Sequence, residues 1–286
     1  MRVQRSGVGM MIATAMMVGW ALVALAAVWR LGVFRGSSVV GPDRTTGANL
    51  LNLSGLGLIG FCVWAVAVGL AGGLAGKVAP GNTQVFVAAG ALATALTAGL
   101  LLLLRQILTP PPPVNLPEIS AVRGLLIGVA GVAVVLPWVW LTLQATLWLR
   151  GIFGDHDQPE HDLLRMMSES GTVGMVVVTY LSAAVVTPIF EEVLFRGVMQ
   201  TFWVGVFAQG LGVAGEGRNS AGSRWGAIVM TSALFALLHA GWSSPAIFVL
   251  SLGLGYVYER TGRLWPVIVM HALFNALSIT LTLVGA

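Results

Sequence analysis

The sequence predicts an all-α protein, a polytopic integral membrane helix bundle with about eight transmembrane helices. The first reason is composition: the 286 residues are 57% hydrophobic and only 9% charged, against about 25% charged in a soluble domain. The second is a mean hydropathy of +0.88. The third is the pattern of long apolar runs without the alternation typical of strands, because lipid accepts only helices and closed barrels.

Apolar runs long enough to span a bilayer define the expected helices, and seven is an equally defensible count. The runs cover residues 8–28, 48–73, 84–104, 124–149, 172–190, 225–239, 245–258 and 264–284. We interpret the first run as an uncleaved transmembrane helix, because about 20 apolar residues exceed the usual core of a signal peptide. The sixth and seventh runs are short, and we expect both helices to be buried among others. Small-xxx-small spacings predict close helix packing at Gly69, Gly72, Gly73, Gly76, Gly124 and Gly128.

A proline-rich connector divides the chain. Four consecutive prolines at 110–113 open a stiff, non-helical stretch that runs to Ser120. We expect N-terminal accessory transmembrane helices in residues 1–120 and a working bundle in residues 121–286. The net charge is +4, and most basic residues flank apolar runs. This distribution is typical of membrane topology, so membrane lipid is an expected partner and nucleic acid is not.

Two polar segments are expected outside the membrane. Residues 210–223 are rich in Gly and Ser, with Glu216, Arg218 and Arg224 in or beside them, which predicts a mobile loop. Residues 155–169 hold five acids and two histidines. A metal site could use His156 and His161, but residues five apart diverge on a helix. An interfacial amphipathic segment is the preferred interpretation.

The most unusual stretch is 188–197, which places two carboxylates and a guanidinium at the end of an apolar run. Glu192 and Arg196 are four apart, so they share a helix face and can pair. Glu191 is rotated by about 100° and has no obvious local partner. Pro188 is expected to start or kink this helix, placing the acids near a helix N-terminus. A salt-bridged helix end at the lipid headgroups explains these residues equally well.

Polar side chains in the later apolar runs favour a functional site. Phe235 and His239 share a helix face, as do His271 and Asn275. Because each polar group needs a partner in lipid, we expect these side chains and Glu191 to meet around one wet cavity. A glutamate there is a competent general base for water, and imidazole and amide donors can stabilise an oxyanion.

A zinc site is the alternative chemistry for the same residues. Glu191, His239 and His271 could hold Zn²⁺ and so activate its bound water. The chain has no His-Glu-x-x-His motif. We therefore predict no metal and no other cofactor.

Three motifs resemble those of a known family. Residues 191–196 (EEVLFR), 235–239 (FALLH) and 271–275 (HALFN) are similar to the EExxxR, FxxxH and HxxxN motifs of the CPBP intramembrane proteases, the CAAX prenyl endopeptidase type II and bacteriocin-processing family. The resemblance covers about residues 172–284. It implies a conical helical bundle whose site opens to one face of the membrane.

The resemblance also implies roles for the motif residues. Glu191 matches the water-activating base, with His239 beside it. His271 and Asn275 match the oxyanion donors, and Glu192 with Arg196 matches the supporting pair, with Phe235 beside His239 in the second motif. The family was long described as metal-dependent, whereas a glutamate mechanism is now favoured.

The expected function is therefore an intramembrane endopeptidase acting by glutamate-activated water in the plasma (inner) membrane. Its partner would be a membrane-associated peptide or protein, either of the prenylated CAAX type or another membrane-proximal peptide. One alternative is a non-catalytic membrane scaffold or regulator that binds a peptide at the same pocket. A small transporter is a further alternative, but no inverted repeat is visible.

Overall fold

The computed structural model describes most of the chain, and the regular structure in this part is entirely helical. The described residues are 7–30, 50–108, 119–154, 172–210, 220–239 and 241–285. Six helices among them are long and apolar enough to cross a membrane. The all-α, polytopic membrane fold is thus confirmed, with six such helices where about eight were expected.

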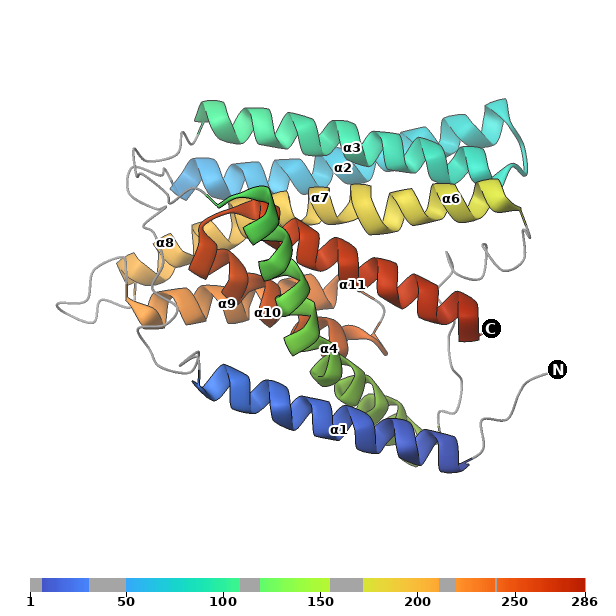
Figure 1. The fold of residues 1–286 in the computed structure, drawn as a ribbon. Coiled ribbons are helices and arrows are strands. Elements are labelled where there is room, and N and C mark those ends of the chain that lie inside the picture. Colours follow the sequence, from blue (N-terminus) through green and yellow to red (C-terminus); the bar gives the residue numbers. More distant parts are fainter. Residues whose placement is uncertain are drawn as a thin grey trace.

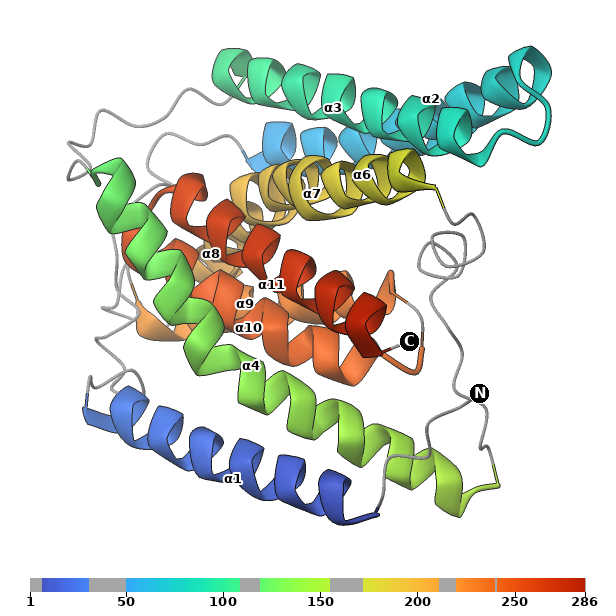
Figure 2. The same ribbon diagram turned by 45° about the vertical axis from the view of Figure 1, so that its right-hand side comes forward.

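The N-terminal helices pack on two sides of the bundle. Helix α1 (Gly7–Arg30) packs against α4 (Ala121–Ile152), whereas α2 (Leu50–Val78) and α3 (Thr83–Leu108) form a helical hairpin. Figures 1 and 2 show α1 and this hairpin on opposite sides of the C-terminal helices. The predicted division near residue 120 stays a prediction.

A long helical segment, called the motif helix below, carries the acidic motif. Residues Val173–Gln209 form one apolar helix of 37 residues, built from five successive pieces. These are α6 (Val173–Leu181), the π-helical η2 (Ser182–Val186), α7 (Thr187–Glu192), the π-helical η3 (Val193–Gln200) and α8 (Thr201–Gly210).

The position of Pro188 corrects one expectation. Pro188 lies in the first turn of α7, directly after η2. The wider π turn bonds residue i to i+5 and lets the helix continue past a residue that has no N–H. The two acids therefore lie inside a continuous helix and not near a helix N-terminus.

The short apolar runs form helices that pack among the others. Helix α9 (Ala221–Leu237) has 17 residues and α10 (Ser244–Thr261) has 18. Neither is among the six candidate spans. They pack against each other, and α10 also packs against α4 and α11 (Leu264–Gly285). The expectation that these two helices are buried is consistent with this packing.

Glycines set the closest helix contacts. A Cβ at Gly124 would lie 2.2 Å from Trp265 Nε1, and one at Gly128 would lie 2.6 Å from Val269 Cγ1. Only glycine therefore lets α4 approach α11 this closely, as the spacing predicted. Gly72 does the same against Phe86 of α3, whereas Gly69, Gly73 and Gly76 have open space beside them.

Two buried apolar clusters stabilise the bundle. One joins α2 and α3 to the motif helix through residues such as Leu101, Phe190 and Val198. The other joins α4, α10 and α11 through residues such as Leu250 and Met270. Large apolar side chains also face outward on α1 to α4, which suits a lipid solvent. The predicted connector at 109–118, the segment at 155–169 and most of the Gly-rich loop lie outside the described residues.

Candidate active site

The Glu192–Arg196 pair predicted from spacing is present. Arg196 Nε lies 3.1 Å from Glu192 Oε2, and both side chains are 0% exposed. The Arg196 guanidinium also lies over the ring of Phe235, 5.3 Å from its centroid. A buried carboxylate needs such a partner, because an isolated charge in a low dielectric is strongly unfavourable.

His271 of α11 lies between the two glutamates. Its Nδ1 is 2.7 Å from Glu192 Oε1 and its Nε2 is 3.7 Å from Glu191 Oε2. Since a carboxylate can only accept, Nδ1–H donates to Glu192, which fixes the orientation of the ring. The second distance exceeds a direct hydrogen bond but is short enough for one water to contact both atoms.

The two adjacent glutamates differ in access. Glu192 is fully buried, whereas the Glu191 side chain is 19% exposed. The two side chains point about 100° apart around the helix axis, so Glu192 faces Arg196 and Glu191 stays partly exposed. Glu191 is therefore the carboxylate that a water or a substrate can reach.

Asn275 binds the backbone of the motif helix. Its Nδ2 donates to the carbonyl oxygen of Ala183 in η2, at 2.8 Å. The Thr187 N–H is taken by Ser182 O, and Pro188 has no N–H to offer. The Asn275 amide thus satisfies a carbonyl that the π turn leaves without a backbone donor. The second N–H of this amide is the one that an oxyanion role would use.

Phe235 connects the second motif to the cluster. Its ring centroid is 4.6 Å from that of His239 and 5.9 Å from that of His271. The two rings are thus in contact, as expected for residues that share a helix face. His239 Nδ1 is 2.7 Å from the Phe235 carbonyl oxygen, so Nδ1–H donates there and Nε2 is the basic nitrogen of the neutral ring.

A second buried polar cluster continues from the first. Arg224 pairs with Glu259, and Gln200 Nε2 donates to Glu259 Oε1 at 2.8 Å. Arg196 Nη2 donates to Ser251 Oγ at 2.9 Å. Arg224, expected in or beside the loop 210–223, lies in the first turn of α9, where it is buried and paired with Glu259 of α10.

Sequence reasoning missed this second cluster. Arg224 and Glu259 each lie one residue outside the apolar runs 225–239 and 245–258. The signal that could have found them is a shared spacing of four: Glu192, Arg196 and Gln200 on one helix, and Ser251, Gly255 and Glu259 on another.

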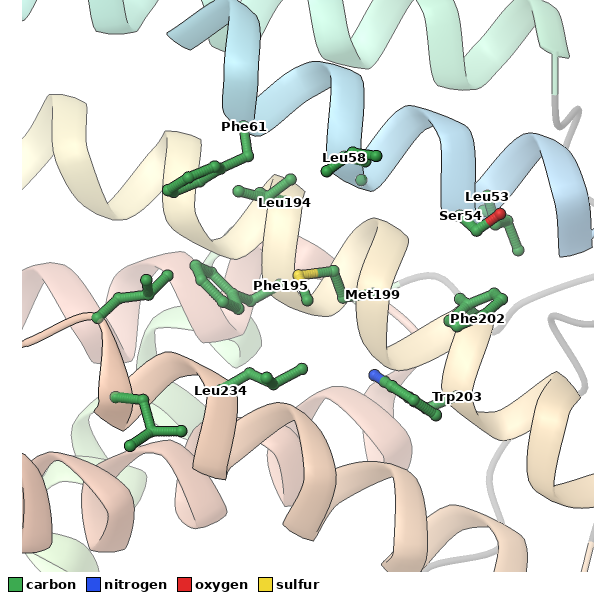
Figure 3. Close-up of a pocket in the computed structure, with 13 residues that line it drawn as sticks. Leu53, Ser54, Leu58, Phe61, Leu194, Phe195, Met199, Phe202, Trp203 and Leu234 are labelled. Carbon is green, nitrogen blue, oxygen red and sulfur yellow. The ribbon is translucent and has the colours of Figure 1, made fainter. Parts of the chain in front are cut away.

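An apolar cavity of about 360 Å³ adjoins the polar cluster. Figure 3 shows side chains from α2, η3 and α9 around it, among them Leu58, Met199 and Leu234. Phe195 belongs to its lining, and its ring meets that of Phe235 edge-on, with 4.8 Å between centroids. The volume lies in the range of small-ligand sites, about 300–1,000 Å³.

Zinc binding is the alternative role predicted for Glu191, His239 and His271. Within the described residues, no three His, Cys, Asp or Glu side chains are grouped so that they could hold an ion. The Nδ1–H of His271 is given to Glu192 and that of His239 to a backbone carbonyl, which leaves Nε2 of each ring as the nitrogen that could bind a metal. The Zn²⁺ alternative stays an alternative, and the absence of a cofactor stays a prediction.

Comparison with protein families gives one match. Residues 173–277, from α6 to most of α11, match the model of the Rce1-like family, described as type II CAAX prenyl endopeptidase Rce1-like. This segment contains all three motifs. No curated protein and no solved structure matches the chain.

Proposed function

Because residues 173–277 match the model of the Rce1-like family of type II CAAX prenyl endopeptidases, we propose that this integral membrane protein is an intramembrane endopeptidase. It hydrolyses a peptide bond of a membrane-associated substrate with water activated by Glu191. The observation that carries the proposal is the asymmetry of the two adjacent glutamates. Glu192 is buried and bound to Arg196 and His271, whereas Glu191 is partly accessible and 3.7 Å from His271 Nε2.

The reaction follows from these positions. A water held between Glu191 and His271 gives its proton to the Glu191 carboxylate, and its oxygen attacks the peptide carbonyl carbon. The resulting oxyanion accepts a hydrogen bond from the second N–H of Asn275. Because the Nδ1–H of His271 is given to Glu192, His271 donates to the oxyanion from Nε2–H in its imidazolium form. Glu191 then delivers the proton to the leaving nitrogen as the C–N bond breaks. His239 acts on the same water through Nε2, as the family resemblance implies.

Glu192 and Arg196 hold this site in place without touching the substrate. The short Glu192–His271 hydrogen bond fixes the imidazole, and Arg196 balances the buried carboxylate. Such fixed donors stabilise developing charge without reorganising during the reaction.

The substrate is proposed to carry a hydrocarbon group, as a prenylated CAAX-type peptide does. The apolar cavity supports this, because its lining is almost free of polar atoms and it meets the active-site cluster at Phe195 and Phe235. A peptide anchored there would present its backbone next to the histidines. The plasma (inner) membrane is the proposed location.

The test is peptide cleavage in membranes containing the full chain. Glu191→Gln keeps the side-chain size but removes the base, so we expect a fall in kcat of about 10²–10⁴-fold. His239→Gln should also lower kcat strongly. Melting in detergent should be little changed for Glu191→Gln, since Glu191 is partly exposed and its contact with His271, at 3.7 Å, is longer than a hydrogen bond. Full activity in both variants would disprove the assignment.

The non-catalytic scaffold makes a different prediction. If the wild-type chain binds but never cleaves peptides, and Glu191→Gln weakens that binding, the polar pocket is a receptor and not an active site. Cross-linking of a photoreactive lipidated peptide measures this binding independently of turnover.

A further inference from the structure

The motif helix and α10 face each other, and on both helices the residues that make polar contacts recur every four positions. The motif helix presents Glu192, Arg196 and Gln200, and α10 presents Ser251, Gly255 and Glu259. Arg196 Nη2 donates to Ser251 Oγ at 2.9 Å. Gln200 Nε2 donates to Gly255 O at 3.1 Å and to Glu259 Oε1 at 2.8 Å. The polar cluster of the active site thus continues into α10.

We propose that Ser251 is a positioning residue for this active site, acting through Arg196 on Glu192 and His271. The inference rests on the proposed function and extends it to a helix that carries none of the three motifs. Within the described residues, the Ser251 side chain is hydrogen-bonded to Arg196 and not to a glutamate, and it is not part of the cavity lining. Its hydroxyl determines where the Arg196 guanidinium lies.

The partners of Arg196 explain why one hydroxyl matters. The guanidinium is 0% exposed and is held by Glu192, by Ser251 and by the face of Phe235. In the part of the chain that the structure describes, its Nη1 has no hydrogen-bond partner. Without Ser251, Nη2 would lose its acceptor as well. The buried guanidinium would then keep only its ion pair with Glu192 and its contact with Phe235, and it would turn toward other acceptors.

A rotation of the Arg196 guanidinium would also move the proposed catalytic groups. Arg196 Nε holds Glu192 Oε2 at 3.1 Å, and Glu192 Oε1 holds His271 Nδ1 at 2.7 Å. His271 Nε2 in turn faces Glu191. If the Glu192 carboxylate rotates with the Arg196 guanidinium, the His271 imidazole changes its orientation toward the water that it shares with Glu191.

The packing of α10 keeps Ser251 in register. One turn later, a Cβ at Gly255 would lie 3.0 Å from Gln200 Oε1 and 3.1 Å from Ile228 Cγ2. This close contact, together with the hydrogen bond from Gln200 to the Gly255 carbonyl, leaves little freedom for α10 to slide along the motif helix. The Ser251 hydroxyl is thus presented to Arg196 by a rigid element.

Ser251→Ala is the test, and the chain offers a matched control. Ser232 in α9 is also 0% exposed, and its Oγ has no hydrogen-bond partner within the described residues. Ser232→Ala therefore removes the same atoms from an equally buried site without breaking a polar contact. Both variants are made in the full chain in detergent micelles and compared for kcat, KM and melting temperature. The ¹⁵N spectra of labelled histidines are also recorded, with His271 assigned through His271→Gln.

We expect Ser251→Ala to lower kcat about tenfold with KM unchanged and to shift the His271 resonances, because a hydrogen bond to a charged group is lost. Ser251→Thr, which keeps the hydroxyl, should retain the wild-type His271 signal. Ser232→Ala should match the wild type in every measurement. Identical kcat and identical His271 spectra for the two alanine variants would overturn the proposal.

The spectra also separate this inference from the proposed function. If the wild-type chain cleaves no peptide, the proposed function fails, yet the His271 signal still reports the coupling to Ser251. A shift in Ser251→Ala then supports the positioning role of this hydroxyl, and its absence contradicts it.

Discussion

Two buried ion pairs in the part of the chain that the structure describes look alike and differ in their neighbours. Glu192–Arg196 lies within one helix, and Arg224–Glu259 joins α9 to α10; all four side chains are almost fully buried. Among the described residues, the first pair contacts a histidine that also faces a partly exposed carboxylate. The second pair is bound to the amide of Gln200. Burial of charge alone therefore does not distinguish the proposed active site, whereas contact with an accessible titratable group does.

The largest effect is expected when the first pair is replaced by apolar residues. Glu192→Leu with Arg196→Met removes both charges together, so no lone charge is left buried. The double variant should remain folded by melting in detergent but lose about 10²–10⁴-fold in kcat, because His271 loses the partner that orients it. Retained activity would show that this pair is structural like the other.

Breaking the second pair should lower stability and leave kcat nearly unchanged. Arg224→Met alone leaves Glu259 without its cation, and breaking a buried pair costs about 3–5 kcal/mol of stability. Adding Glu259→Met should restore much of that stability. In both variants the kcat of the folded fraction should stay within about threefold of the wild type. A large loss of kcat in the stable double variant would place this cluster in the catalytic machinery.

A smaller effect is expected at the apolar cavity. Leu58 lies on the exposed side of α2 and lines the cavity, so Leu58→Trp should fill part of it. KM should rise several-fold for a lipidated peptide, because about one to three kcal/mol separates well-fitting from poorly fitting apolar groups. The same peptide without its lipid should be unaffected.

Leu70→Trp is the control for this change. Leu70 lies on the same helix, is similarly exposed and is not part of the cavity lining. An equal rise of KM in both variants would point to a general effect of the added ring and not to occupancy of the cavity by the lipid group.

Features that depend on helical periodicity were predictable from the sequence. The Glu192–Arg196 pair and the Phe235–His239 contact both follow from a spacing of four. The all-α membrane fold followed from composition. The close approach at Gly124 and Gly128 followed from small residues at the same spacing.

Features that depend on how helices rotate against each other were not predictable. Spacing along α11 places His271 and Asn275 on one face but does not say that His271 binds Glu192 or that Asn275 binds Ala183. The rotation is set by two π segments, which hydropathy does not reveal. Arg224 and Glu259 were missed because paired charges can lie deeper in a bundle than the ends of apolar runs suggest.

The π segment η2 has a consequence for how mutations are tolerated. Each wide turn holds roughly one residue more than a regular α turn. Deleting one residue from 182–186 would let the segment relax to regular geometry without breaking the helix. Every side chain upstream would then be offset by about 100° around the axis relative to Glu191 and Glu192. The membrane segment would stay long and apolar, but its two halves could no longer both pack against the helices that surround them.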